Sequence, residues 1–365
     1  MTKKANKKVD VLIVGGGIIG MLTARNLANQ GLNIALIDKG KLGGEATWAA
    51  GGILSPLNPW QETSETKLLI NEGRQNFATL AEELKQETNI DPQLIKSGML
   101  VLNVDEKQQA LDWAKQNNEP IEVLKHLALR GLVPNLSEDI DEALFLPNIE
   151  QIRPPRLIAA LQQSLHLRRV NVYEHTAVTK ILVEANSITG VATEFENISA
   201  GKVILCSGAW TKNLLPNNSA IKHDIEPVRG QMLLYQLPET TFSQIVMQEN
   251  SYLIPRLDGH ILCGSTVEHV GFENKITQEA LTSLQNIAHN LVPLLASHQP
   301  IKQWSALRPG TQRNAPYICK HPTIAGLYIN SGHYRYGITM SIASARIMLE
   351  LITDSLNSSQ TVAYA

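Results

Sequence analysis

The chain has 365 residues, of which 43% are hydrophobic and 18% are charged, and its formal net charge is −2. This length suggests two domains or one large domain with insertions, and the ordinary apolar content excludes disorder in the body of the chain. The near-neutral charge argues against wholesale binding to nucleic acid or to an anionic membrane. No apolar run approaches the roughly 18 residues that span a bilayer, and the lysine-rich start lacks the apolar run of a secretion signal. We therefore predict a soluble cytoplasmic protein.

The three cysteines, Cys206, Cys263 and Cys319, lie far apart and form no CxxC pair. This spacing predicts small buried thiols in a reducing compartment, and it predicts no metal site.

The front of the chain predicts a strand–helix–strand unit. Residues 9–14 form a short β-branched run, glycine-rich residues 15–20 follow, and residues 21–29 have helix-forming side chains. Gly31 ends this helix, and residues 33–38 have the composition of a second strand.

The glycines of this unit have the spacing of a dinucleotide-binding turn. Gly15 would make the tight turn, Gly17 would let a pyrophosphate approach, and Gly20 would let the helix pack on the strand. Asp38 ends the second strand, where such a turn places its ribose-binding carboxylate. The alternative is an ordinary strand–helix turn with a surface aspartate.

The remaining pattern predicts a second, sheet-rich region inserted into the first. We expect helices at residues 64–85, 106–116, 154–165, 278–291 and 342–352. We expect strands at residues 98–104, 170–173, 178–184, 190–194 and 202–206, and several more within 225–267, antiparallel in appearance. The fold class is therefore α/β (α+β). It combines a Rossmann-like nucleotide-binding domain (1–55, 145–220 and 310–365) with an inserted, mostly antiparallel substrate-binding domain (56–144 and 221–309).

Four stretches follow one another in order: GGGIIG at 15–20, GGEATWAAGGIL at 43–54, LRPGT at 307–311 and GHYRYGI at 332–338. Together with Asp38 they resemble the D-amino-acid oxidase family of flavoenzymes, and within it the glycine oxidase branch of thiamine biosynthesis. The resemblance covers nearly the whole chain. It implies non-covalent FAD as the cofactor.

The resemblance also implies which residues contact the flavin dinucleotide, and they come from six parts of the chain. They are Gly15, Gly17, Ile18, Ile19 and Gly20; Asp38 and Lys39; Ala46, Thr47, Gly51, Gly52 and Ile53; Val178; Ser207 and Gly208; and His333, Tyr334, Arg335, Tyr336, Gly337, Ile338 and Thr339.

Three further residues are implied to bind the substrate. Arg308 would form a fork on an amino-acid carboxylate with Arg335 beside it, and Tyr252 would add a hydroxyl contact. The alternatives are a surface ion pair for Arg308, which a Pro-Gly turn is expected to follow, an exposed turn for Arg335, and strand packing for Tyr252.

The activity implied by the resemblance is oxidation of glycine and other small amino acids. Hydride would pass from the α-carbon to the flavin, and dioxygen would then accept the electrons to give hydrogen peroxide. No general base is required, because positioning supplies most of the rate. The implied partners are a small amino acid and dioxygen, with a homodimer or homotetramer as the assembly. The alternatives are a dehydrogenase that passes electrons to a quinone, a tRNA-modifying FAD oxidase, and a flavin-binding protein without catalysis.

Overall fold

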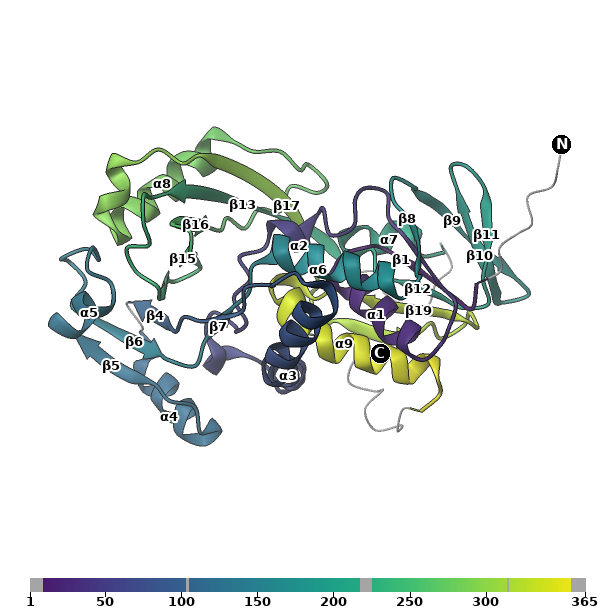
Figure 1. The fold of residues 1–365 in the computed structure, drawn as a ribbon, viewed down its shortest axis with the longest axis horizontal. Coiled ribbons are helices and arrows are strands. Elements are labelled where there is room, and N and C mark those ends of the chain that lie inside the picture. Colours follow the sequence, from purple (N-terminus) through teal and green to yellow (C-terminus); the bar gives the residue numbers. More distant parts are fainter. Residues whose placement is uncertain (1–8, 103–104, 217–224, 314, 356–365) are drawn as a thin grey trace.

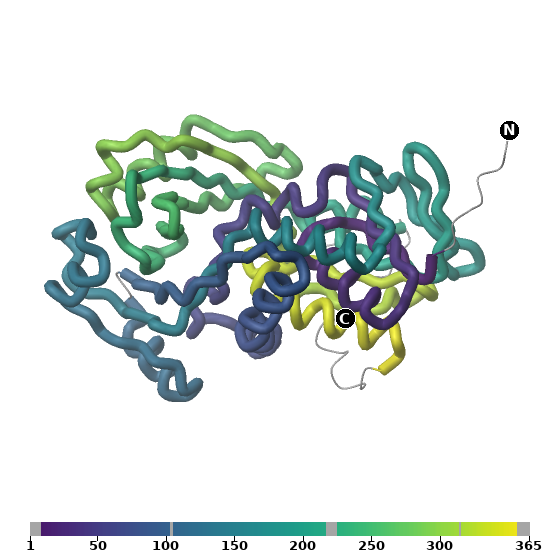
Figure 2. Tube along the Cα trace, in the orientation of Figure 1, coloured from purple at the N-terminus to yellow at the C-terminus, as the bar shows by residue number. Residues whose placement is uncertain are grey.

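The structure is a computed structural model that describes residues 9–102, 105–216, 225–313 and 315–355. Two large sheets lie beside one another, and α3 (Ser64–Thr88) and α9 (Gly337–Ile352) lie near the region where they meet (Figure 1). The chain passes between the two halves several times, as its colours show in Figure 2. The lysine-rich start and the last two residues of the strand expected at 98–104 lie outside the described residues.

The first sheet has six strands in the order β18-β19-β12-β1-β2-β8. They are β1 (Val11–Val14), β2 (Ile34–Ile37), β8 (Asn171–Tyr173), β12 (Val203–Leu205), β18 (Tyr317–Lys320) and β19 (Leu327–Ser331). Neighbouring strands are parallel except for β18, which runs antiparallel to β19. The central strands β1, β2 and β12 are buried throughout, which is why they are short and apolar.

Layers of different kinds cover the two faces of this sheet. Val11 and Ile13 point to the face covered by α1 (Ile18–Asn29), α6 (Pro154–Leu167), α3 and α9. Leu12 and Val14 point to the opposite face, because side chains alternate along a strand. That face is covered by an antiparallel sheet made of β9 (Val178–Glu184), β10 (Ser187–Thr193) and β11 (Asn197–Ser199).

The second sheet has eight strands in the order β17-β13-β16-β15-β14-β4-β6-β5. They are β4 (Met99–Leu102), β5 (Glu122–Lys125), β6 (Glu142–Leu146), β13 (Glu226–Gln236), β14 (Ile245–Gln248), β15 (Ser251–Pro255), β16 (His260–Gly264) and β17 (Lys302–Gly310). Its pairs are antiparallel apart from β4 with β14.

The two faces of the second sheet have different neighbours. On one face, Leu233 and Tyr235 pack with α8 (Gln278–Leu291). On the other face, Met232, Tyr252 and Ile254 belong to a separate cluster that includes Leu57, from the segment after β2. This second face carries the side chains that reach the functional site.

Short segments connect these layers. They are α2 (Ala46–Ala49), α4 (Lys107–Asn117), α5 (Leu127–Leu132), α7 (Thr211–Leu214), β3 (Ile95–Lys96), β7 (Glu150–Gln151) and the 3-10 turns η1 (Pro59–Gln61), η2 (Gly208–Trp210), η3 (Pro293–Ser297) and η4 (Tyr334–Tyr336). Within the described ranges, no helix has the length and apolar character needed to cross a membrane. The three cysteines are free and buried, as predicted.

The predicted fold class is confirmed, and three local predictions are wrong. The strands near residues 170–173 and 202–206 belong to the parallel sheet and not to an antiparallel series. The Pro-Gly turn expected directly after Arg308 is strand, since β17 continues to Gly310 along the edge of its sheet, where proline is tolerated. The last helix begins at Gly337, five residues before the position expected from its apolar pattern.

The domain limits stay a prediction. The helix α3 was expected in the inserted domain, but its residues Phe77 and Leu84 pack into the helical layer that covers the first sheet.

Candidate active site

A cavity of about 460 Å³ lies between the two sheets and is lined by residues of both. Its walls include the β1–α1 turn, the segment after β2, the start of β9, the turn before α9, and the inner faces of β13, β15 and β17. A volume of this size is within the range of small-molecule and cofactor sites.

The glycine turn forms one part of the wall. Gly15 has a φ of +109°, and a Cβ there would lie 2.3 Å from the Cys206 carbonyl oxygen, so only glycine fits. Gly17 caps α1, and the cavity is lined by Gly17, Ile18 and Ile19 at the N-terminus of that helix. Exposed N–H groups and the helix dipole favour a phosphate at such a place.

Asp38 lies beside this turn at the end of β2. Its two carboxylate oxygens accept hydrogen bonds from the backbone N–H of Gly16 (2.7 Å) and of Gly40 (2.8 Å). These bonds fix the carboxylate at the cavity wall, where a ribose hydroxyl can also donate to it. The neighbouring Lys39 pairs with Glu45 at 3.4 Å and lies over the Trp210 ring at 3.3 Å from its centroid. Lys39 is therefore engaged within the protein.

The glycine- and alanine-rich residues 43–54 after β2, called the small-residue segment below, run along the cavity. Thr47 in α2 accepts a hydrogen bond from the backbone N–H of Ile18 at 3.0 Å, which joins this segment to the glycine turn. A Cβ at Gly51 would lie 2.6 Å from Ile254, and a Cβ at Gly52 would lie 2.1 Å from the Ile152 carbonyl oxygen. Gly51 therefore allows the close contact with Ile254 of the second sheet, and Gly52 allows the close contact with the backbone of Ile152.

A buried arginine, Arg256, stabilises this segment through a hydrogen bond to Gly51. Arg256 is 4% exposed. Its guanidinium donates to the Gly51 carbonyl (2.6 Å), to the Gln151 side-chain oxygen (2.5 Å) and to the Ile152 carbonyl (3.2 Å). Burial lowers the pKa of Arg256 to about 9. Its acceptors lie at Gly51 and at the adjacent residues 151–152, both more than 100 residues away in the sequence, so no local pattern indicates its role.

The C-terminal wall is the turn η4 and the first turn of α9. His333 is buried, its Nε2 lies 2.8 Å from the Ser344 hydroxyl, and burial lowers its pKa to about 3. Tyr336 donates to Glu62 at 2.7 Å, and burial raises the pKa of Glu62 above its usual range. The N-terminus of α9 at Gly337 faces the cavity, and its dipole favours negative charge on a bound group.

The substrate end of the cavity is formed by the second sheet. Tyr252 is 9% exposed and lines the cavity from β15. Arg308 reaches the cavity from β17, donates to the Ser265 hydroxyl at 2.7 Å and to the Thr266 carbonyl at 3.1 Å, and has its pKa lowered by burial. Arg308 also interacts with the Tyr252 hydroxyl, and none of these partners is a carboxylate. The alternative of a surface ion pair is therefore wrong, and the charge of Arg308 is available to a bound carboxylate.

Arg335 lies at the same end and is held more loosely. It donates to the exposed Asn250 side chain at 2.8 Å, and its buried Nε makes no hydrogen bond to the described part of the chain. Arg335 is close enough to Arg308 for its charge to lower the pKa of Arg308 further.

The structure brings together all but one of the residues that the sequence singled out. Every expected cofactor and substrate residue lines the cavity except Gly20. A Cβ at Gly20 would lie 1.9 Å from the Gly15 carbonyl oxygen, so this glycine serves the packing of α1 on the turn. Arg256, Ser265 and Glu62 were not expected from the sequence, because none of them stands in a motif of its own.

The cavity fits FAD. Its glycine turn at a helix N-terminus suits a pyrophosphate, Asp38 suits a ribose, and the start of β9 at Val178 lines the same end. The first turn of α9 suits the carbonyl end of an isoalloxazine ring, which carries negative charge when reduced. Within the described residues, no group of histidine, cysteine and carboxylate side chains could hold a metal ion.

Comparison with known proteins agrees with this geometry. The model of the FAD dependent oxidoreductase (DAO) family matches residues 10–351. The chain is 38% identical over 344 residues to the glycine oxidase of Pseudomonas aeruginosa, with 94% of each chain covered. It is 28% identical to the bifunctional protein ThiO/ThiG of Synechocystis sp., covering 94% of this chain and 52% of that protein. The crystal structure of the Bacillus cereus glycine oxidase superposes with a TM-score of 0.90 at 30% identity, covering 97% of this chain and 98% of the other.

The matched region includes the glycine turn, Asp38, the small-residue segment and the turn before α9, and these are the parts that line the cavity. The chain belongs to the FAD dependent oxidoreductase (DAO) family, and its cofactor is FAD.

Proposed function

We propose that this protein is an FAD-dependent oxidase of glycine and other small amino acids. The observation that carries the proposal is the position of Arg308. This arginine lines the same cavity as the dinucleotide-binding turn, and its hydrogen-bond partners in the protein are neutral. The similarity to glycine oxidases supports glycine as the substrate.

In this proposal the substrate carboxylate lies on the guanidinium of Arg308. Two parallel N–H···O bonds fix the direction of a carboxylate as well as its position. Tyr252 lines the cavity from β15 of the same sheet, and its hydroxyl supplies a further contact. Arg335 adds positive charge at this end. These contacts hold the α-carbon of the substrate in a defined place.

FAD supplies the hydride acceptor when it is bound. The protein residues orient the substrate and exclude water, which is sufficient for this chemistry because no side chain must take up the α-proton. His333 is unsuited to the role of general base, because it is buried, bonded to Ser344 and has a pKa lowered to about 3. We therefore assign His333 a structural role in the turn before α9.

The walls of the substrate end favour small substrates. Met232 and Tyr252 are both buried and face the cavity. A Cβ at Gly264 would lie 3.0 Å from Met232 and 3.2 Å from Tyr252, so both side chains pack closely against Gly264 and cannot withdraw from the cavity in that direction. Glycine, which has no side chain, requires the least space here.

The wider role follows from the product. Oxidation of glycine gives an imine, and the similarity to a ThiO/ThiG protein supports its use in thiamine thiazole synthesis. Dioxygen as electron acceptor, a dimer or tetramer, non-covalent attachment of FAD and a cytoplasmic location stay predictions.

The test is turnover of the FAD-loaded protein with glycine in air-saturated buffer. We expect dioxygen consumption with equal amounts of hydrogen peroxide and ammonia. Reduction of a quinone analogue by glycine without peroxide would instead identify the dehydrogenase. A gel shift with tRNA would favour the RNA-modifying alternative.

A further inference from the structure

The side chain of Arg308 crosses a neighbouring strand to reach its partners. Arg308 on β17 pairs with Val228 on β13, so the two side chains share one face of the sheet. Gly230 is two residues further along β13 and shares that face. A Cβ at Gly230 would lie 2.2–2.4 Å from three atoms of the Arg308 guanidinium. The guanidinium therefore lies over Gly230, and the Arg308 side chain extends across β13 to the side opposite β17.

On that far side, Arg308 meets the segment 265–268, which continues from β16 along β13. Arg308 donates to the Ser265 hydroxyl and to the Thr266 carbonyl. The position of the guanidinium therefore depends on how firmly this segment is held.

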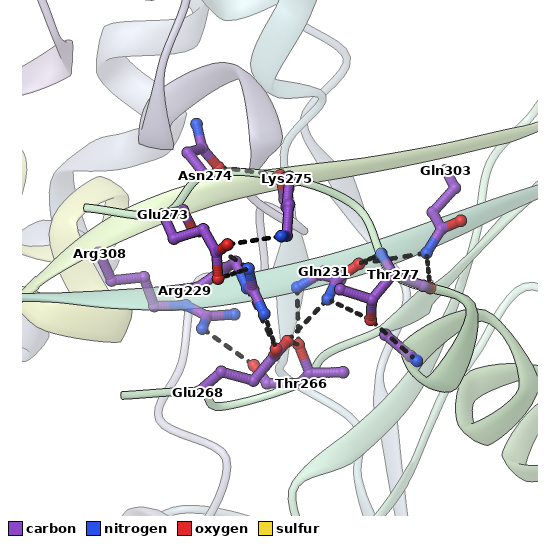
Figure 3. A network of polar contacts seen from close by, with 12 residues as sticks. Arg229, Gln231, Thr266, Glu268, Glu273, Asn274, Lys275, Thr277, Gln303 and Arg308 are labelled. Carbon is purple, nitrogen blue, oxygen red and sulfur yellow. Dashed lines mark hydrogen bonds and ion pairs between the residues drawn. The ribbon is translucent and has the colours of Figure 1, made fainter. Parts of the chain in front are cut away.

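The segment is held by a network of polar contacts, shown in Figure 3. The backbones of Arg229 and Glu268 exchange two hydrogen bonds of 2.9 Å. The Glu268 carboxylate accepts from the Arg229 guanidinium at 2.5 and 3.1 Å, from the Thr266 hydroxyl at 2.5 Å and from the Gln231 amide at 2.9 Å. The Thr266 hydroxyl in turn accepts from the backbone N–H of Gln231 at 2.9 Å.

The network also keeps the negative charge of Glu268 paired with Arg229 and away from Arg308. Burial alone would raise the pKa of Glu268, but hydrogen bonds from Arg229, Thr266 and Gln231 lower it below its usual range. The carboxylate is therefore ionised, and its charge is matched by Arg229, which is 4% exposed. Glu268, which is two residues from Thr266, is thus paired with Arg229 and does not neutralise the charge of Arg308.

We propose that Glu268 and Arg229 are positioning residues for glycine oxidation. Glu268, held by Arg229, fixes Thr266, and Thr266 fixes the guanidinium of Arg308 so that its remaining N–H groups face the substrate carboxylate. This inference deepens the proposed function and rests on it.

The test uses the FAD-loaded enzyme and two readouts. The first is the affinity for glycolate, a carboxylate of glycine's size, measured as the perturbation of the flavin spectrum on titration. The second is the steady-state split between KM and kcat for glycine. For Glu268→Gln we expect about a tenfold weaker affinity for glycolate and a KM raised by a similar factor, with kcat changed by less than about twofold.

The matched control is Glu273→Gln. Glu273 is exposed and also pairs with Arg229, at 3.5 Å, but in the structure its side chain pairs with Lys275 and not with Thr266. We expect this variant to match the wild type in both readouts. A KM raised equally in the two glutamate variants would show a general effect of charge and would overturn the proposal.

A second pair of variants decides the matter if Glu268→Gln fails to fold. Thr266→Val removes the hydroxyl at nearly constant volume, whereas Thr266→Ser keeps the hydroxyl. We expect Thr266→Val to weaken glycolate binding several-fold and Thr266→Ser to retain it. If the wild type binds glycolate and Thr266→Val binds it equally well, the positioning role is wrong. If the wild type neither binds glycolate nor oxidises glycine, the proposed function itself is wrong.

Discussion

The chemistry of the site depends on the planar fork of one side chain, Arg308. Lysine at this position keeps the positive charge but lacks the planar fork, which contacts the Ser265 hydroxyl and the Thr266 carbonyl and still offers parallel N–H groups to a carboxylate. For Arg308→Lys we expect a glycine KM about 10- to 100-fold higher, which corresponds to the loss of about 1.5–3 kcal/mol for a hydrogen bond to a charged group. Steady-state kinetics with a measurement of bound FAD checks this. A variant that loses FAD in parallel with activity would show that Arg308 serves the cofactor.

A second prediction at this scale concerns pH and His333. Its pKa is about 3 in the folded protein, against an ordinary value near 6.5 when unfolded. Between these values the unfolded chain binds a proton that the folded protein excludes, so His333 makes the protein less stable as the pH falls below 6.5. The slope is at most about 1.4 kcal/mol per pH unit.

We therefore expect His333→Gln to lose less stability than the wild type between pH 7 and pH 5, as measured by urea unfolding at both values. Parallel losses in the two proteins would contradict a neutral, buried His333.

Most residues that line the cavity could be predicted from the sequence because they stand in contiguous motifs. The glycine turn and Asp38 could be predicted from the local geometry that a dinucleotide imposes. Ser265 and Arg256 could not be predicted, because each bonds to a residue that is distant in the sequence. Arg256 donates to the Gly51 carbonyl, and Ser265 accepts from Arg308.

At the scale of elements, the helix α3 supports the cavity wall. Gly73 is buried where α3 crosses α9, and a Cβ there would lie 1.7 Å from the carbonyl oxygen of Thr339, which lines the cavity. Gly73→Ala must therefore push the two helices apart. We expect a loss of about 1–3 kcal/mol in stability, as for overpacked cores, together with weaker FAD binding.

Thermal unfolding and FAD titration measure these two effects. The control is Gly131→Ala in the exposed helix α5, where an added Cβ meets no atom within 4 Å. We expect Gly131→Ala to leave both quantities near or above the wild-type values, because alanine favours a helix more than glycine does. Equal behaviour of the two variants would show that the crossing of α3 and α9 does not support the cofactor site.

The elements that were predicted correctly are those with a strong local period. The helix at Gln278–Leu291 has the expected bounds, since an apolar stripe faces the sheet and Pro293 follows its end. The start of α9 was missed because its first turn, which contains Gly337, faces the cavity and carries no regular apolar pattern. The Pro-Gly pair after Arg308 is typical of a turn, and only its place on an edge strand allows it to remain extended.

For the whole molecule, the cavity depends on the two sheets keeping a fixed relation. Arg256 joins the second sheet to Gly51, which lines the cavity, and to residues 151–152, which pair with Gly52 and Ile53. Arg256→Met would leave buried oxygen atoms without donors. We expect its melting temperature to fall by about 5 °C or more and its FAD to dissociate more readily.

Differential scanning calorimetry of the FAD-loaded protein checks this, with Arg169→Met at an exposed position as the control. A melting temperature equal to that of the wild type would show that packing alone maintains the contact between the sheets.

The most direct measurement is the visible spectrum of the purified protein during anaerobic titration with glycine. It depends on bound FAD and on substrate held by Arg308, but not on the identity of the final electron acceptor. We expect a flavin spectrum that is bleached by glycine in the wild type, with a much higher glycine requirement in Arg308→Lys. A flavin spectrum that glycine leaves unchanged, or the same glycine requirement in both proteins, would contradict the account.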